Sequence, residues 1–554
     1  MARARSFKNS QIAEYPSPIF QLLSVSHLTS LFSSSSPKTP RTQKFLPSSP
    51  SLLLFSLFIF FSFSVLLILT TQSSIPCSVV FPSSPLSSFS LSSLDPIVGD
   101  DDKPRLWRGE MVPLPVRGVY GNVSKLEEEF WRQPDGEGYQ PCLDFSIKYR
   151  RESPAVAKER WRFLMVVASG GLNQQRNQIV DAVVIARILK AALVVPVLQV
   201  NLIWGDESEF SDIFDVEHFK RTLQADVRIV SSLPSTHLVS RQSVEAQIPF
   251  DVSPTWIRTR FFKLINEEGL LVLKGLDSKL SKNLPPDLQK LRCKVAFHAL
   301  RFAAPILELG NRLARRMWIE GPYIAIHLRL EKDVWVRTGC LTGLGPQYDD
   351  QITKERNIGP QFLTGRHNLS CSDRRLAGLC PLNAFEVARL LKALGAPRNA
   401  RLYIAGGEPY GGSQAVKPLV DEFPNVVTKQ MLAREGELLP FVDKPSTLAA
   451  LDYIVSLSSD VFMPSHGGNM GRAMQGPNKR MMLSFFEDSS ISEDEFGATM
   501  RKLHEKSQGQ PESRVGKRRR DRSRDVIAYP VPECMCKRRS SLFRTGRTYL
   551  TGYM

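Results

Sequence analysis

The segment from Tyr323 to Asp333 places side chains suited to anion and acid–base chemistry directly after an apolar run. Residues 323–326 predict a strand that is buried on both faces, as in a parallel sheet. The ionisable side chains that follow stand at alternate positions, which an extended chain would turn to one side: His327, Arg329, Glu331 and Asp333. Because ligands of open α/β sheets bind at the carboxyl ends of strands, this is a candidate site. The alternative is that these residues are charged only because the end of the strand is exposed to solvent.

Three other turns follow apolar strands: Ser169–Asn173, 405–408 and 465–469. Each contains a glycine pair, which is Gly170 and Gly171 in the first turn. Glycine lets the backbone come close to a ligand, and the helix after the first turn offers free N–H groups to an anion. Each turn alone is more simply structural. Since all four segments follow strands and three contain glycine pairs, together they predict one site.

The elements that must hold these turns form two successive α/β halves. In the first half, a strand at 163–168, a helix at 175–190 and a strand at 193–196 make a βαβ unit, so the sheet should be parallel. A helix over 295–318 is expected to connect the halves. The second half should alternate strands at 323–329, 401–405, 426–428 and 460–463 with helices at 381–394, 413–422 and 447–458. Two such halves predict a cleft between them, the usual place for a nucleotide-linked substrate.

The segment Ser51–Thr70 contains no charged residue and predicts a membrane-spanning helix. As a helix it would extend about 30 Å, which matches the hydrocarbon core of a bilayer. Arg41 and Lys44 precede it and the next charge is Asp95, so the positive-inside bias places the N-terminus in the cytosol. A cleaved signal peptide is the alternative, disfavoured by the length of the run and of the sequence before it. We expect a single-pass type II anchor.

This orientation places all eight cysteines in an oxidising lumen, where disulfides are the default, although the sequence leaves their pairing open. It also makes Asn122 and Asn368 candidate N-glycosylation sites, because both begin Asn-x-Ser sequons. Cys534 and Cys536 lack the second Cys/His pair that zinc would need.

We expect the following organisation: a disordered cytosolic segment at 1–50, the anchor at 51–70, a Ser/Pro-rich stem at 71–105, an N-terminal Rossmann-like half at 106–317, a C-terminal Rossmann-like half with the donor site at 318–486, and an acidic, then basic, loosely ordered tail at 487–554. Much of the net charge of +17 lies in that tail. Basic runs attract phosphate chains, but no nucleic-acid module accompanies Lys517–Arg520, so we expect no nucleic-acid partner.

The chain lacks the sequence signatures of several enzyme classes. There is no Walker lysine motif, no Gly-x-Ser-x-Gly elbow and no HExxH, which argues against NTPase, esterase and zincin functions. The Asp-x-Asp spacing that presents a divalent ion occurs only at Asp100–Asp102, in the expected stem. We therefore expect no cofactor and no divalent metal. A diphosphate leaving group would then need Arg329 and the N–H groups of the glycine turns.

Four segments resemble motifs of the plant O-fucosyltransferase-like glycosyltransferase family: residues 169–176, 326–333, 402–411 and 450–462. The closing Pro532–Cys536 is similar to that family's C-terminal signature, and the likeness spans about residues 105–536. It implies a GT-B fold, in which two Rossmann-like domains flank a donor cleft, and metal-independent inverting transfer. The family is also related to pectin rhamnosyltransferases. Many members carry Tyr-Asp-Gly-Asn-Met where this chain has His466–Met470, without the acid.

The resemblance also implies roles for residues. Arg329 would grip the donor diphosphate, Asp452 would face the nucleotide base, and the turn 465–469 would contact the phosphates. The implied donor site comprises Gly170, Gly171, Asn173, His327, Arg329, Asp452, Ser465, His466, Gly468 and Asn469.

We expect a Golgi membrane enzyme that transfers fucose from GDP-fucose to a hydroxyl of a protein or glycan acceptor. Arg329 would neutralise the departing diphosphate. Glu331 or Asp333 would either accept the acceptor proton or hold Arg329 in position, and the sequence leaves these roles open. The alternatives are rhamnosyl transfer from UDP-rhamnose in pectin synthesis and a non-catalytic, membrane-tethered glycan-binding protein.

Overall fold

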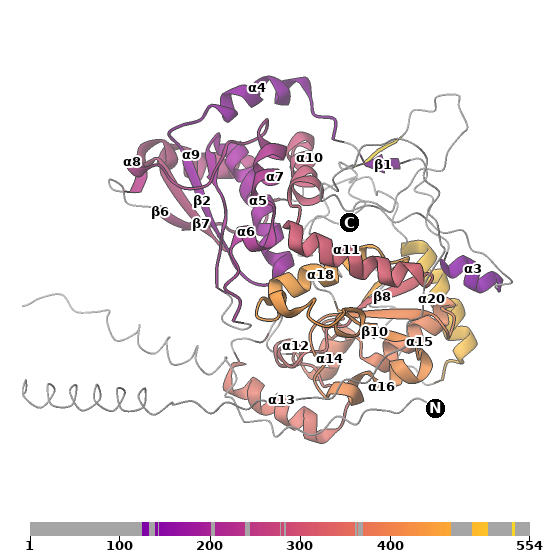
Figure 1. Cartoon of the computed structure of the whole chain (residues 1–554). Coiled ribbons are helices and arrows are strands. Elements are labelled where there is room, and N and C mark those ends of the chain that lie inside the picture. Colours follow the sequence, from indigo (N-terminus) through magenta and orange to yellow (C-terminus); the bar gives the residue numbers. More distant parts are fainter. Residues whose placement is uncertain are drawn as a thin grey trace, which may run out of the picture. The chain divides into compact units, whose positions relative to one another are not determined.

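The computed structural model describes residues 124–131, 139–141, 143–200, 205–238, 244–277, 279–281, 284–360, 363, 369–466, 490–507 and 535–537 (Figure 1). All of them belong to a compact unit that spans Trp107–Met554. Within these residues no helix combines the length and the apolar character that crossing a bilayer requires. The expected segments 1–50, 51–70 and 71–105 lie outside the described residues, as do Asn122, Asn368, Gly468 and Asn469.

The first sheet is parallel and centres on β2 (Phe163–Ala168), in the order β5-β3-β2-β7-β6. Its other strands are β3 (Ala192–Val194), β4 (Val197–Leu198), β5 (Ile229–Val230), β6 (Val244–Gln247) and β7 (Leu270–Lys274). Helix α5 (Leu172–Leu189) joins β2 to β3, which pair in parallel, so the predicted βαβ unit is confirmed. The prediction missed β6 and β7. The remaining helices here are α4 (Ile147–Ala157), α6 (Phe210–Ile213), α7 (Val216–Leu223), α8 (Ser235–Leu238), α9 (Pro254–Glu268) and α10 (Pro286–Lys294).

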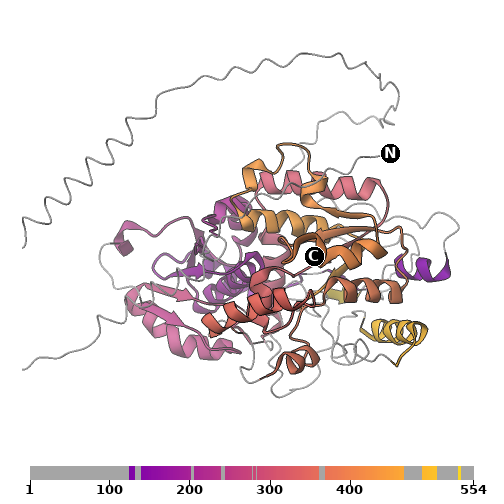
Figure 2. The same ribbon diagram turned by 90° about the horizontal axis from the view of Figure 1, so that it is seen from below.

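The second sheet is also parallel, in the order β10-β9-β8-β11. Its strands are β8 (Tyr323–His327), β9 (Arg401–Ala405), β10 (Val426–Thr428) and β11 (Val461–Pro464). Alternate residues of β8 pack into two different hydrophobic clusters: Tyr323 and Ala325 into one, Ile324 and Ile326 into the other. Helices therefore cover both faces of this sheet (Figure 2), and the prediction that 323–326 is buried on both faces is confirmed.

The three helices predicted for the second half are confirmed as α15 (Ala384–Leu394), α16 (Gly412–Glu422) and α18 (Pro445–Leu457). The prediction missed α12 (Lys332–Thr338), α13 (Pro346–Ile358), α14 (Cys371–Leu376), α17 (Lys429–Leu432) and a 3₁₀ turn at Leu439–Phe441. Glu331 has an extended backbone and is the N-cap of α12, so Asp333 lies in the first turn of a helix. The expectation that all four ionisable residues follow one extended chain is therefore wrong for Asp333.

The single helix expected over 295–318 is also wrong. The chain forms a π-helical turn at Val295–Ala299 and then a separate helix, α11 (Ala304–Ile319). Pro305 explains the break, because proline lacks an N–H group and its ring clashes with the carbonyl four residues earlier in a continuous helix. Helix α11 packs closely on α18: a Cβ atom on Gly310 would lie 2.5 Å from Cδ1 of Ile454.

The C-terminal segment contains a helix where loose order was expected between Glu487 and Val526, and a strand beyond that range. Helix α20 (Glu493–Ser507) buries Phe496 and Met500 in the same cluster as α15, so this acidic stretch is not a loose tail. Strand β12 (Met535–Lys537) pairs antiparallel with β1 (Tyr139–Pro141), which follows α3 (Lys125–Trp131). The predicted C-terminal signature thus returns to the start of the folded part.

The predicted use of cysteines in disulfides is confirmed for Cys340 and Cys380, which bond to each other, and for Cys293. Cys371, by contrast, is a free thiol.

Candidate active site

Three of the four predicted turns meet at the carboxyl edge of the second sheet. In the strand register, His327 at the end of β8 is opposite Ala405 of β9 on one side and Pro464 of β11 on the other. The backbone continues these links beyond the strands: the N–H of Leu328 donates to the carbonyl of Ala405 at 3.0 Å, and that of Ser465 donates to His327 at 3.0 Å. Parallel pairing alone therefore brings together segments that are more than 130 residues apart in the sequence.

Arg329 is held at this edge with part of its guanidinium available. Its backbone N–H donates to Oγ of the buried Ser465 at 2.9 Å, and its Nε lies 3.3 Å from Oε2 of Glu331. About a quarter of the Arg329 side chain is exposed. Within the described part of the chain, neither Nη group has a hydrogen-bond or ion-pair partner. The Nη edge, which fits two oxygen atoms of a phosphate, is thus not engaged by any described residue.

Glu331 holds Arg329 and the turn after β9 at the same time. Its Oε1 accepts a hydrogen bond from the N–H of Gly407 at 3.0 Å, while Oε2 faces Arg329. A Cβ on Gly407 would lie 3.0 Å from Cγ of Glu331, and one on Gly406, whose φ is +136°, would lie 2.9 Å from the carbonyl oxygen of Leu328. The glycine pair is needed because the two turns touch at the level of the backbone.

Asp333 points to a different partner. It lies in the first turn of α12, and its Oδ2 accepts from Nη2 of Arg337, four residues later, at 2.8 Å. Of the two acids, therefore, Glu331 is the one placed to orient Arg329. Their catalytic roles stay predictions.

A buried ion pair supports the Gly406 turn from within the second half. Asp452 on α18 accepts from Nζ of Lys429 at 2.8 Å, from the hydroxyl of Tyr403 at 2.7 Å and from the N–H of Gly406 at 3.1 Å. Lys429 also donates to the carbonyl of Gly406 at 2.7 Å. Burial first, and then the carboxylate of Asp452, raise the pKa of Tyr403 well above its usual range. Sequence reasoning placed Asp452 against a nucleotide base, whereas here both its oxygens are engaged by the chain itself.

Sequence reasoning did not single out Lys429. The signal was present, because Lys429 directly follows β10 and so belongs to the same edge as His327 and Ala405. The short strand lacks the glycine pair that drew attention to the other turns.

His327 lies at the centre of this edge and is neutral. Burial is the main cause, and the nearby Arg329, His466 and Lys429 add to it, so that the pKa of His327 falls to about 3. Its Nδ1 is buried, and no group of the described residues bonds to it. A neutral imidazole in this position can donate or accept a hydrogen bond without adding a third positive charge.

The fourth predicted turn, Ser169–Asn173, stands at the end of β2 in the first half. Gly170 has a φ of +87°, Gly171 is the N-cap of α5, and Gln178 bonds to both the N–H and the carbonyl of Ser169. The link from this motif to the second half runs through Arg176, whose guanidinium carbon lies 4.4 Å from the ring centre of Tyr453, next to Asp452. A donor role for Gly170, Gly171 and Asn173 stays a prediction.

The side chains of the described residues do not form a cluster of three or more His, Cys, Asp or Glu groups suited to a metal ion.

Comparisons with known proteins agree on one family. The model of the family described as GDP-fucose protein O-fucosyltransferase matches residues 163–481. O-fucosyltransferase 37 of Arabidopsis thaliana is 67% identical over 82% of this chain and 84% of its own length, and O-fucosyltransferase 20 of the same plant is 50% identical over 97% of both chains. Rhamnogalacturonan I rhamnosyltransferase 1 of Arabidopsis thaliana is 36% identical over 67% of this chain and 77% of its own length.

Among solved structures, the crystal structure of POFUT1 in complex with GDP matches 56% of this chain and 93% of its own, with 11% identity and a TM-score of 0.32.

We expect His327 to make the protein less stable as the pH falls. The folded protein holds this group neutral down to a pH of about 3, whereas the unfolded chain takes up a proton near pH 6.5, so acid favours unfolding. From pH 7 to pH 5 the loss should be up to about 2 kcal/mol. In His327→Gln the decrease in unfolding free energy over this range should be smaller by that amount. Denaturant unfolding at both pH values measures it; identical decreases in the variant and the wild type would contradict the burial of this imidazole.

Proposed function

Because the chain belongs to the GDP-fucose protein O-fucosyltransferase family, as the sequence motifs had suggested, we propose that it transfers fucose from GDP-fucose to a hydroxyl group of a protein or glycan acceptor. The family makes the chain a glycosyltransferase. We further propose that the two α/β halves form a GT-B enzyme with the donor between them, and that transfer inverts the sugar and needs no divalent metal. The observation that carries the proposal is the Nη edge of Arg329 at the carboxyl edge of the second sheet, which no described residue engages.

The proposed step is a single displacement at the anomeric carbon of fucose. The acceptor oxygen forms the new bond while the bond from that carbon to the diphosphate oxygen breaks, the proton of the acceptor hydroxyl passes to solvent water, and GDP leaves. Negative charge therefore grows on the diphosphate in the transition state. The guanidinium of Arg329 is placed to bind two of its oxygen atoms, and it is already oriented by Glu331 and Ser465.

The position of Glu331 favours one of its two proposed roles. An acid that accepts the acceptor proton must be within reach of the acceptor, but Glu331 is engaged by Arg329 and by the N–H of Gly407. We therefore propose that Glu331 positions Arg329. Neutral His327, beside it, can hydrogen-bond the donor without repelling the guanidinium.

Replacing Arg329 by Lys should lower kcat by about 100-fold or more, because an ammonium group cannot make two parallel hydrogen bonds to the developing charge. Release of GDP from GDP-fucose, with and without acceptor, measures the loss. Arg337→Lys is the matched control and should retain most activity, since Arg337 lies one helical turn after Asp333 and pairs with it rather than with Arg329. Near wild-type turnover by Arg329→Lys would remove Arg329 from the proposed role.

A second candidate is rhamnosyl transfer from UDP-rhamnose. It is favoured by one observation, the 36% identity to Rhamnogalacturonan I rhamnosyltransferase 1. Fucose and rhamnose are both deoxyhexoses, so the nucleotide is the sharper distinction between these donors.

Thermal unfolding with GDP and with UDP should separate the two donors. A nucleotide present at 100 times its Kd stabilises the folded protein by about 2.7 kcal/mol, whereas one that does not bind has no effect. We expect GDP to raise Tm by several degrees and UDP to leave it unchanged. The opposite pattern would favour rhamnosyl transfer, and stabilisation by saccharides without release of any nucleotide would favour a non-catalytic glycan binder.

We also propose that the enzyme is a single-pass type II protein of the Golgi membrane with its catalytic part in the lumen. The support is the uncharged run Ser51–Thr70 with basic residues only on its N-terminal side. Protease treatment of intact Golgi vesicles should leave a C-terminal tag protected and remove an N-terminal one. Accessibility of the C-terminal tag in intact vesicles would contradict this orientation.

A further inference from the structure

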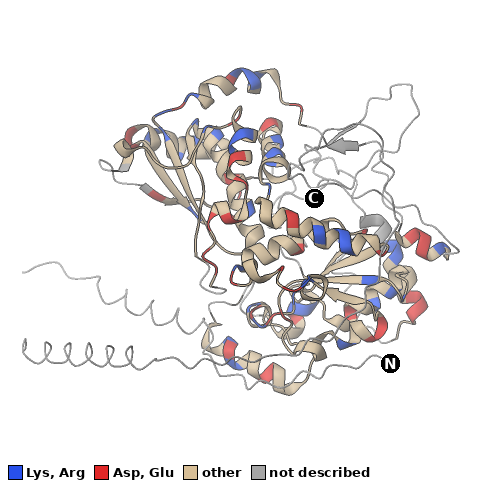
Figure 3. Ribbon diagram, viewed as in Figure 1, with Lys and Arg blue, Asp and Glu red and all other residues tan. Residues whose placement is uncertain are grey.

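A basic surface lies on the first half, away from the candidate active site. Residues 147–162, which form α4 and the segment leading into β2, contain six Lys or Arg residues and two Glu residues. Figure 3 shows this concentration of basic residues along α4 and the loop after it. We use the name α4 basic face for the exposed members of this set: Lys148, Arg150, Arg151, Lys158 and Arg160.

The helix that carries this face is fixed by its opposite side. Tyr149, Ser153 and Val156 of α4 are buried, and the hydroxyl of Tyr149 donates to Asp226 at 2.8 Å. Arg187 donates to the carbonyl of Tyr149 and lies against its ring. These buried contacts fix the rotation of α4 about its axis, so its basic side chains have a defined position on the surface.

Little negative charge offsets the α4 basic face. Arg150 has one ion pair, with Asp144 at 3.8 Å, and both side chains are more than 60% exposed, so the pair is weak. For the other four members, no ion pair with any described residue is found. Such uncompensated charge on a rigid support attracts a polyanion.

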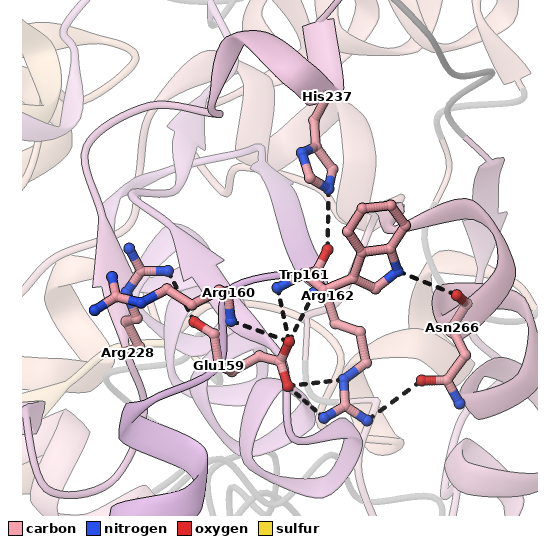
Figure 4. A network of polar contacts seen from close by, with 7 residues as sticks. All are labelled: Glu159, Arg160, Trp161, Arg162, Arg228, His237 and Asn266. Carbon is pink, nitrogen blue, oxygen red and sulfur yellow. Dashed lines mark hydrogen bonds and ion pairs between the residues drawn. The ribbon is translucent and has the colours of Figure 1, made fainter.

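Of the two acids in residues 147–162, Glu152 is exposed on α4 itself and Glu159 is engaged by the backbone and by Arg162. Glu159 accepts hydrogen bonds from the N–H groups of Arg160, Trp161 and Arg162, and its other oxygen pairs with the Arg162 guanidinium (Figure 4). Although burial acts to raise it, these bonds lower the pKa of Glu159. The side chain of Arg160 is thus not neutralised by its neighbour.

Trp161, which directly follows Arg160 in the chain, carries an exposed ring that is held by a hydrogen bond. Its side chain is 45% exposed, yet its indole N–H donates to the carbonyl of Asn266 at 3.2 Å and its own carbonyl bonds to Nε2 of His237 at 3.0 Å (Figure 4). Phe262, a second exposed ring, lies near Arg162, whose guanidinium carbon is 5.5 Å from its centre. A ring held in this way can stack on a ligand with little loss of side-chain entropy.

We propose that the α4 basic face and Trp161 bind an acidic polysaccharide, a sugar chain that carries carboxylates. Guanidinium and ammonium groups pair with the carboxylates, and the apolar face of a sugar ring stacks on the indole. The site is distinct from the donor site: Trp161 precedes the six-residue strand β2, whereas Gly170 follows it, which separates the two by about 20 Å. A polysaccharide held here would be tethered to the enzyme between transfer events.

Anionic membranes and nucleic acids would also be attracted by this charge, and an exposed ring can contact either of them. Sugar chains are favoured by the class of the enzyme, because a glycosyltransferase meets them as substrates. The binding needs no donor, so its test is independent of the proposed transfer reaction.

The test is direct binding of the full chain, without donor, to polygalacturonate, to neutral galactan of similar length and to vesicles of phosphatidylserine and phosphatidylcholine. We expect binding to polygalacturonate that weakens as salt is added, and at least tenfold weaker binding to galactan, on the order expected when complementary charge is lost. Equal binding to both polysaccharides, or tighter binding to the vesicles, would overturn the proposal.

Two sets of variants locate the site. The triple variant Lys148→Gln, Arg151→Gln, Arg160→Gln should bind polygalacturonate about tenfold more weakly. The matched control Lys354→Gln, Arg398→Gln, Lys417→Gln removes the same charge from exposed positions of the second half and should change binding less than about twofold. Equal weakening in both sets would mean that only net charge matters, and would contradict a specific site.

Trp161 is tested at constant charge. Trp161→Ala should weaken binding several-fold, and Trp161→Phe should restore most of it, because Phe keeps a ring that can stack. An unchanged Tm in each variant shows that the fold is retained. If Trp161→Ala binds as the wild type does while the charge variant does not, the indole has no part in the site and the proposal of a sugar-specific surface is wrong.

Discussion

The arrangement of the candidate active site depends on the buried carboxylate of Asp452. An isolated carboxylate would be costly in this interior, but Lys429, Tyr403 and the N–H of Gly406 together satisfy it. Removing one partner of such a buried pair typically costs about 3–5 kcal/mol, so the partners are strongly constrained. Because Gly406 is one of them, the turn after β9 is fixed, and the next residue, Gly407, is then placed to bond Glu331 and through it to orient Arg329. The orientation of the Arg329 guanidinium thus depends on the buried Lys429–Asp452 ion pair, which need not contact the ligand.

The charges at the carboxyl edge of the second sheet are balanced, so that the guanidinium of Arg329 is the cationic group that a ligand would meet. Lys429 is neutralised by Asp452, and His327 stays uncharged because burial and the neighbouring cations lower its pKa to about 3. One carboxylate oxygen of Glu331 pairs with Nε of Arg329, and the other accepts a hydrogen bond from the N–H of Gly407. An arriving anion therefore meets the Nη edge of one oriented guanidinium rather than a diffuse cluster of positive charge. Such preorganisation favours a defined orientation of the ligand over simple attraction.

Local pattern was enough to predict most of the second sheet. The bounds of β9 and β10 were predicted to the residue, because short apolar runs between polar turns have few other interpretations. The prediction failed where the local geometry changes: α12 begins after Glu331 and takes Asp333 into a helix, and Pro305 divides the helix expected over 295–318. The pair Arg329–Glu331 could be anticipated from adjacency. The pair Lys429–Asp452 could not, because it requires β10 and α18 to lie together, and no local pattern specifies that contact.

One turn of α18 shows how the first half is connected to this site. Successive side chains on a helix point about 100° apart, so Asp452, Tyr453 and Ile454 face three directions. Asp452 faces the Gly406 turn, Tyr453 lies against Arg176 of the first half, and Ile454 packs on Gly310 of α11. Further contacts between the halves lie at the N-terminal end of α18, where Ser446 bonds Asp206 and Lys444 pairs with Asp212. A shift of α18 relative to the first half would therefore move Asp452 and, through Gly406 and Glu331, the guanidinium of Arg329. The polar contacts described for Arg329 all lie in the second half. The position of the first half nevertheless affects the geometry of the site, because it contacts α18.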